Sequence, residues 1–177
     1  MAKKPGGLTI VYTGQGKGKT TAALGLALRA AAYNKKVAMV QFVKSAKESG
    51  EMKIAQRLKP RFIIRALGRG YVGIQKDTQP LSAHQKAARA AFREARHWLK
   101  RCDVLILDEI NGAVAGKLIP LNKVIDLIKH KPSSLTLVLT GRRAHPRVIK
   151  MADLVTEMKE IKHPFRKGIL AQPGIDY

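Results

Sequence analysis

Residues 8–33 read LTIVYTGQGKGKTTAALGLALRAAAY, and this stretch decides the fold class. It opens on LTIVY, a short apolar run typical of a buried strand, and closes on residues 19–33, which are rich in Ala and Leu as helices are. Three glycines lie between the two, and the last of them opens the sequence GKT at residues 18–20. A strand that passes through a glycine-rich loop into a helix is the setting of a phosphate-binding loop. We therefore expect this stretch to bind a nucleoside triphosphate, with ATP as the leading candidate.

The parts of the loop have distinct physical roles. Glycines let successive backbone N–H groups turn toward one anion, and the positive end of the following helix points the same way. Lys19 supplies a point charge for the phosphates, and Thr20 supplies a hydroxyl for a magnesium ion. Lys17 is a further cation, which either contacts phosphate or is only solvated. The predicted nucleotide-binding residues of the loop are Gly14, Gln15, Gly16, Lys17, Gly18, Lys19, Thr20 and Thr21.

The loop departs from the usual pattern at one position. A glycine is expected five residues before Gly18, and Thr13 stands there instead. The loop therefore reads as shortened by one residue, with Gly14 at its start. A glycine-rich turn that merely joins strand to helix is the alternative, but the GKT ending and its context favour the phosphate loop.

The rest of the chain alternates between strand and helix patterns. Strand patterns cover residues 36–43, 61–67, 104–107, 135–140 and 154–158, and helical patterns cover residues 47–59, 82–101, 121–130 and 144–151. Ser82 is expected to cap the long helix, while residues 68–79 form a loop and residues 161–177 are irregular. The alternation predicts one α/β domain over residues 1–177, with a mostly parallel six-stranded sheet and helices on both faces.

Charge is the unusual bulk property of the chain. It has 34 Lys and Arg against 12 Asp and Glu, a formal net charge of +22, which attracts polyanions such as nucleic acid. The cations are spread over helices such as residues 83–101, so we favour simple solvation of the surface. Cys102 is the one cysteine, which excludes an intrachain disulfide. The apolar run of residues 8–12 is too short for a signal core or a membrane span, so we expect a cytoplasmic protein.

Two acidic residues, Asp108 and Glu109, follow the apolar strand of residues 104–107. Acidic residues at such a strand end hold magnesium directly or through water, as a Walker B carboxylate does. The predicted metal-binding residues are therefore Thr20, Asp108 and Glu109. The alternative that one of the two acids caps the next helix stays open, because spacing alone does not distinguish them.

Residues 140–145, TGRRAH, follow another apolar strand. Ligands of parallel sheets bind at the carboxyl ends of strands, so this segment is expected near the loop and the acidic pair. It presents cations to the phosphates or to a second substrate, or else it is a basic loop in which His145 caps or packs. Trp98 lies on the long helix and is expected in the core.

With these segments the chain resembles a known family, the P-loop type of ATP:cob(I)alamin (corrinoid) adenosyltransferases. The resemblance spans residues 7–177. It is carried by GLTIVYTGQGKGKTTAALGLALRA (residues 7–30), VQFVK (40–44), VLILDEI (104–110), LTGRRAH (139–145) and KHPFRKGILAQPGIDY (162–177). Many ATPases share the loop, whereas the shortened loop together with TGR and the AQPGIDY ending is far more specific.

The resemblance implies a RecA-like sheet, usually a homodimer, and an unusual reaction. In this family a cobalt(I) corrinoid attacks the 5′-carbon of ATP, and inorganic triphosphate leaves. The nucleotide sits reversed in the loop, which suits a loop altered at Thr13. Arg29 matches a family arginine that contacts the phosphates, so the implied catalytic residues are Lys19, Thr20 and Arg29. Mg²⁺ is the implied cofactor, and an electron-donating reductase the implied partner.

The resemblance places the corrinoid at the segment after the third strand, where this chain departs from the family. The family has bulky aromatic residues there, which push away the lower ligand of the cobalt. Here Arg69 replaces one aromatic and Tyr71 is a smaller one in place of the other, so the implied corrinoid-binding residues are Arg69, Gly70 and Tyr71. An ordinary surface loop is the alternative. Only seven residues precede the first strand, so we expect the N-terminal helix that covers the partner's site in some members to be absent.

The leading hypothesis is a transferase that moves the adenosyl group of ATP to a reduced corrinoid. The first alternative is a RecA-like ATPase that binds nucleic acid, which rests on the loop and the charge of +22. The second is a non-enzymatic carrier that binds nucleotide and corrinoid. The nine aromatic residues do not cluster on a basic strand, which argues against the first alternative.

Overall fold

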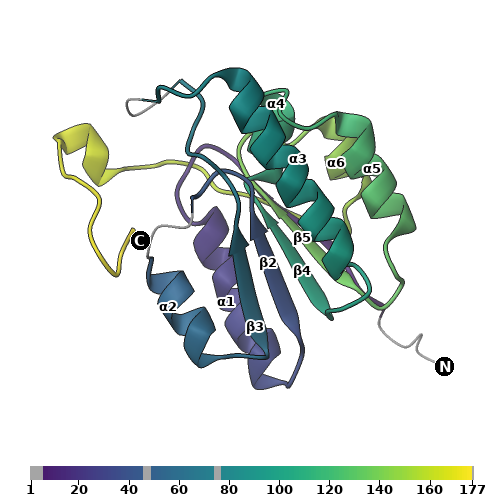
Figure 1. Cartoon of the computed structure of the whole chain (residues 1–177). Helices are drawn as coiled ribbons and strands as arrows, with labels where there is room; N and C mark the ends of the chain where they lie inside the picture. Colours follow the sequence, from purple (N-terminus) through teal and green to yellow (C-terminus); the bar gives the residue numbers. More distant parts are fainter. Residues whose placement is uncertain (1–5, 46–48, 74–76, 177) are drawn as a thin grey trace.

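The fold is a single sheet of parallel strands between two layers of helices, seen in a computed structural model that describes residues 6–45, 49–73 and 77–176 (Figure 1). The sheet has six strands in the order β3-β2-β4-β5-β1-β6, and all pairs are parallel. The strands are β1 Thr9–Thr13, β2 Val37–Gln41, β3 Phe62–Ala66, β4 Val104–Asp108, β5 Thr136–Thr140 and β6 Leu154–Glu157. The predicted six-stranded α/β architecture is confirmed.

Helices cover both faces of the sheet (Figure 1). The helices are α1 Lys19–Ala32, α2 Gly50–Arg57, α3 Leu81–Trp98, α4 Ile110–Ala115, α5 Leu121–His130 and α6 Pro146–Met151, with a 3₁₀ turn, η1, at Pro164–Lys167. Helices α1 and α2 pack on one face and α3 to α6 on the other, which gives two separate apolar clusters. Trp98 lies in the cluster between the sheet and helices α3 to α6, as expected of a core residue.

The apolar strands supply both clusters because side chains alternate between the faces of a sheet. On β4, Leu105 and Leu107 pack toward α3 to α6, while Ile106 packs toward α1 and α2. All three are fully buried. A strand that is buried on both sides needs an unbroken apolar run, which is why the sequence pattern identifies these strands so well.

Two local predictions are wrong. Helix α3 begins at Leu81 after Pro80, so Ser82 lies inside the first turn and caps nothing. Proline fits this position because its extended backbone leads into the helix and it has no N–H that needs a partner. The short helix α4 was not predicted, since six residues with a central glycine carry no helical periodicity.

The strand order brings the polar strand ends into one row. Gln41 is paired in register with Asp108, and Tyr12 with Thr140, while β4 and β5 are neighbours. Residues from β2, β4, β5 and β1 therefore end side by side at the carboxyl edge of the sheet, where open α/β sheets bind ligands. No helix in the described part of the chain combines the length and the apolar character that crossing a bilayer requires.

Candidate functional site

The loop between β1 and α1 has a backbone that only glycine accepts at two points. Gly14 and Gly18 have φ of 96° and 115°, a region that side chains rarely enter. A Cβ on Gly14 would lie 2.4 Å from the carbonyl oxygen of Met158. The N–H of Gly16 donates to the same oxygen at 2.7 Å. The loop is therefore pressed against the segment that follows β6.

Thr13, the residue that departs from the loop pattern, has a structural contact of its own. Its hydroxyl oxygen accepts a hydrogen bond of 3.1 Å from the N–H of Ala144. The end of β1 is thus tied to the segment of residues 141–145 after β5. A glycine at position 13 would lack this link.

Lys19 places a buried positive charge at the centre of the loop. Its side chain is 6% exposed, and its Nζ donates to the carbonyl oxygens of Gly14 at 2.9 Å and Gly16 at 2.7 Å. Burial lowers the pKa of Lys19, and the negative charge of Glu109 opposes that shift. The cation therefore lies within electrostatic reach of the acidic residues at the end of β4.

Asp108 is a buried carboxylate surrounded by neutral donors. Its Oδ1 accepts from the hydroxyls of Thr20 at 2.9 Å and Thr140 at 2.8 Å, and its Oδ2 accepts from Nε2 of Gln41 at 3.3 Å. Only 1% of the residue is exposed, and burial raises its pKa. Among the described residues it forms no ion pair. A buried carboxylate without a cation is costly, so this group favours a bound cation.

Glu109 lies beside Asp108 but in a different geometry. It occupies the N-cap position of α4 with φ of 63°, and its side chain makes no capping hydrogen bond. Its backbone N–H donates to the hydroxyl oxygen of Thr140 at 2.9 Å. Burial raises the pKa of Glu109, and the charge of Asp108 raises it further. The alternative of a capping carboxylate is thus not what the structure contains.

Three further residues of this site lie outside the loop. Sequence reasoning expected Thr140 near the site as part of residues 140–145, but it assigned no role to Gln41 or Lys44. Gln41 and Thr140 bind Asp108 directly, as described above. Lys44 forms a 2.5 Å ion pair with Glu51 of α2, and its positive charge partly opposes the rise that burial causes in the pKa values of Asp108 and Glu109. A polar residue at the end of an apolar strand is the sequence feature that could have identified Gln41 and Thr140 as site residues.

The segment after β5 carries a cation near the loop and a histidine that caps the next helix. The positive charge of Arg142 acts on Lys19 and on Glu109, which places this cation near the loop. His145 caps α6, where its Nδ1 accepts from the N–H of Arg147 at 3.1 Å. In this segment, Arg142 therefore supplies the positive charge near the loop, and His145 caps α6.

A hollow of about 620 Å³ adjoins the loop. It is lined by Gln15, Arg142, Glu157, Met158, Lys159, Glu160, His163, Phe165 and Arg166. The C-terminal tail lies on the loop as well, because Nζ of Lys17 donates to the carbonyl oxygen of Ile175 at 3.0 Å and forms an ion pair with Asp176. Lys17 is thus held by the C-terminal tail.

Two predicted nucleotide-binding residues are exposed on α1. Thr21 is exposed in the first turn of α1. Arg29 is exposed in the last turn, roughly ten residues and about 15 Å along the helix axis from Lys19. The structure does not bring Arg29 to the loop of its own chain.

The segment after β3 is held along the segment after β2. The N–H groups of Gly68 and Gly70 donate to the carbonyl oxygens of Lys44 at 2.9 Å and Val43 at 2.8 Å. Tyr71 is 47% exposed, and its pKa is raised to about 12 by partial burial and by the negative charges of Glu109 and Asp108. The charges of Glu109 and Asp108 therefore reach Tyr71, which puts the segment after β3 within electrostatic range of the acidic pair.

Comparison with known proteins identifies the family of this chain. A model of the family described as ATP:corrinoid adenosyltransferase BtuR/CobO/CobP matches residues 5–177. The chain belongs to this family. The corrinoid adenosyltransferase of Escherichia coli K12 is 37% identical over 179 residues, which cover 100% of this chain and 89% of the relative. A corrinoid adenosyltransferase of a Sinorhizobium species is 39% identical over 175 residues, or 97% and 80% of the two chains. The resemblance predicted from the motifs is confirmed.

Solved structures agree on the fold of this adenosyltransferase family member. The flagellar accessory protein FlaH of Methanocaldococcus jannaschii superposes with a TM-score of 0.59 at 16% identity, over 86% of this chain and 71% of FlaH. A KaiC-like protein of Pyrococcus horikoshii gives 0.56 at 16% identity, over 89% and 76%. The predicted RecA-like P-loop fold is confirmed.

Proposed function

We propose that this chain transfers the 5′-deoxyadenosyl group of ATP to the cobalt(I) of a reduced corrinoid and releases inorganic triphosphate. The observation that carries the proposal is a phosphate loop, closed around a buried Lys19, in a chain that matches the adenosyltransferase family from residue 5 to residue 177. The cobalt electron pair forms the bond to C5′, and the electron pair of the broken C5′–O bond leaves with the triphosphate.

The residues of the loop would stabilise the leaving group. Negative charge grows on the triphosphate as the C5′–O bond breaks, and cations and N–H groups aimed at it lower the barrier. Lys19, Thr20 and the amides of residues 14–18 fit this role, with Lys17 joining them once it leaves Asp176. No proton is transferred in this reaction, so the chain needs no general base to activate its nucleophile.

The acidic pair fits a magnesium ion. Magnesium prefers oxygen ligands and keeps several waters, and Thr20 and Asp108 present two oxygens that lie 2.9 Å apart. In the described residues, no group of three or more His, Cys, Asp and Glu is placed to hold a metal ion, so the remaining ligands would be phosphate oxygens and water. Magnesium bound there would add positive charge beside the triphosphate. We assign direct contact to Asp108 and a contact through water to Glu109.

The remaining assignments complete the site. The hollow beside Gln15 and Arg142 has the volume of a small-molecule site and would hold the part of ATP that extends beyond the loop. Arg69, Gly70 and Tyr71 would contact the corrinoid, for which a reductase supplies the electron. We keep Arg29 as a phosphate contact because of the family match. In this structure, however, Arg29 lies too far along α1 to contact phosphates bound at the loop of its own chain. A homodimer in which Arg29 serves the partner's site would satisfy both facts.

The inorganic product tests the reaction. We expect anaerobic turnover of reduced corrinoid, ATP and Mg²⁺ to give triphosphate in a phosphorus NMR spectrum, together with the spectrum of the adenosylated corrinoid. Lys19→Ala should reduce kcat/KM by roughly 10²–10³-fold, since it removes a charge that contacts the leaving group. Lys129→Ala is the matched control, because this exposed lysine ends α5 at the opposite edge of the sheet. Orthophosphate as the sole product would refute the proposal.

A further inference from the structure

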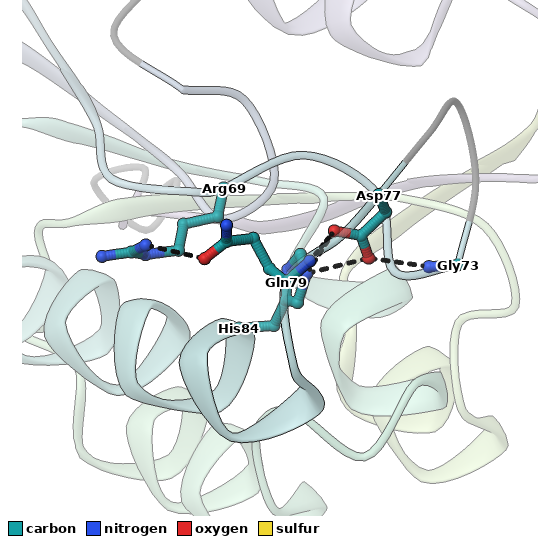
Figure 2. Close-up of polar contacts among 5 residues, drawn as sticks. All are labelled: Arg69, Gly73, Asp77, Gln79 and His84. Carbon is teal, nitrogen blue, oxygen red and sulfur yellow. Dashed lines mark hydrogen bonds and ion pairs between the residues drawn. The ribbon is translucent and has the colours of Figure 1, made fainter.

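The segment between β3 and α3 contains a buried hydrogen-bonded contact between a histidine and a carboxylate, which the site described above does not use. Nε2 of His84 lies 3.1 Å from Oδ1 and 3.0 Å from Oδ2 of Asp77 (Figure 2). The side chains of His84 and Asp77 are 2% and 7% exposed. Burial of a carboxylate in a surface segment is costly unless its oxygens are fully hydrogen-bonded, so this contact requires an explanation.

Asp77 also holds the backbone on both of its sides. Its Oδ2 accepts from the N–H of Gly73 at 2.9 Å, and its Oδ1 accepts from the N–H of Gln79 at 3.0 Å. These two backbone hydrogen bonds, and then the one from His84, lower the pKa of Asp77. The carboxylate is therefore ionised at neutral pH and accepts hydrogen bonds from Gly73, Gln79 and His84 together.

The contact continues to Arg69, one of the residues assigned to the corrinoid. The side-chain oxygen of Gln79 accepts from Nη1 of Arg69 at 3.1 Å (Figure 2). A chain of hydrogen bonds thus runs from His84 through Asp77 and Gln79 to Arg69. His84 belongs to α3, which is packed on the sheet through Ala88, Ala91 and Ala95. The chain of bonds is therefore anchored in the rigid part of the fold.

The backbone near Tyr71 needs such an anchor. Gly70 and Gly73 have φ of 99° and 67°, and a Cβ on either would meet nothing within 4 Å. Glycines in open space leave a segment with high conformational entropy unless hydrogen bonds hold it. One end is held by the bond from Gly70 to Val43, and the other by the bond from Gly73 to Asp77. Tyr71 lies between these two points.

We propose that Asp77 and His84 are positioning residues that hold Arg69 and Tyr71 in place for the corrinoid, and that they set the affinity for this substrate and not the affinity for ATP. The inference rests on the proposed function, because that function makes Arg69 and Tyr71 corrinoid contacts. We expect only corrinoid affinity to change, because the hydrogen bonds of Asp77 within the described part of the chain go to Gly73, Gln79 and His84, and none goes to the loop around Lys19.

Three variants test the proposal. Asp77→Asn replaces one acceptor oxygen by a donor, and His84→Ala removes the donor from α3. His84→Gln is the conservative variant, because its side-chain amide can still donate to Asp77. We expect the first two to raise the KM for corrinoid about tenfold, with the Kd for Mg·ATP unchanged by calorimetry, since small misplacements of substrate contacts are costly. His84→Gln should stay within about threefold of the parent protein, because its donor is kept.

A control variant and a binding assay without turnover distinguish the positioning role from a general loss of structure. His97→Gln alters an exposed histidine at the end of the same helix and should change neither constant. Equilibrium binding of cob(II)alamin, followed by its absorbance, measures corrinoid affinity without turnover. If the parent protein binds cob(II)alamin but releases no triphosphate, the proposed reaction fails while the variants still test the positioning role. An unchanged corrinoid affinity in Asp77→Asn and His84→Ala, a parallel loss of ATP binding, or no corrinoid binding by the parent protein would each overturn the inference.

Discussion

At the scale of single residues, Thr140 connects the two carboxylates of the site. Its hydroxyl donates to Asp108 and accepts from the N–H of Glu109, and the residue is fully buried. Thr140→Val keeps the shape but leaves a buried N–H without a partner and takes one donor from a buried carboxylate. We expect the free energy of unfolding, measured in urea, to fall by about 1–3 kcal/mol. The affinity for ATP in the presence of Mg²⁺ should fall as well, because Asp108 loses its orientation.

Thr136→Val is the control for that experiment. Thr136 begins the same strand, and its hydroxyl accepts an exposed hydrogen bond of 3.4 Å from the N–H of Leu8. Its replacement should cost less than about 0.5 kcal/mol. Equal losses in the two variants would show that the contact with the carboxylates is not what stabilises Thr140.

A second residue-scale prediction concerns Cys102. Its Sγ donates to the carbonyl oxygen of Trp98 at 3.2 Å, and burial raises the pKa of its thiol to about 12. Because only the thiolate reacts with alkylating agents, very little of the folded protein is reactive at pH 8. We expect iodoacetamide to label the folded chain at least about 100-fold more slowly than the chain in urea. Rapid labelling of the folded protein, detected by mass spectrometry, would contradict this assignment.

At the scale of elements, a glycine before α1 and a glycine within it should respond in opposite directions to replacement by alanine. Gly14 has φ of 96° and no room for a Cβ, so Gly14→Ala should destabilise the protein by about 1–3 kcal/mol and weaken ATP binding. Gly25 lies within α1, where a Cβ would meet nothing within 4 Å. Gly25→Ala should therefore stabilise the protein by roughly 0.5–1 kcal/mol and leave ATP binding unchanged. Thermal unfolding and calorimetry measure both effects, and a loss of stability in both variants would refute the argument.

The same scale explains which elements could be predicted. Strands such as β4 and the helix α5 were located closely, since an apolar run or a regular apolar stripe is a local property of the chain. Helix α4 was missed because it is short, and the start of α3 was misplaced by one residue because Pro80 rather than Ser82 precedes it. Element ends depend on single backbone conformations, which composition describes poorly.

At the scale of the whole molecule, the charge of +22 is the property that the site does not require. A surface of this charge should bind duplex DNA without sequence preference, and the affinity should fall at least about tenfold between 50 and 200 mM salt as counterions compete. We expect added DNA to leave the rate of triphosphate formation unchanged at 200 mM salt. Stimulation of orthophosphate release by DNA would instead favour the nucleic-acid ATPase. Both outcomes can be followed by phosphorus NMR and by fluorescence anisotropy of labelled DNA.

The sequence by itself determined the nucleotide loop and the fold class. The residues of the loop are continuous in the chain, so its glycines, Lys19 and Thr20 can be recognised from their spacing within a few residues. Only the tertiary structure decided that Asp108 meets Thr20, Gln41 and Thr140, that Arg29 lies away from the loop, and that His84 holds Asp77. These contacts join side chains from different elements, and they follow from the order and register of the strands, which no local pattern encodes.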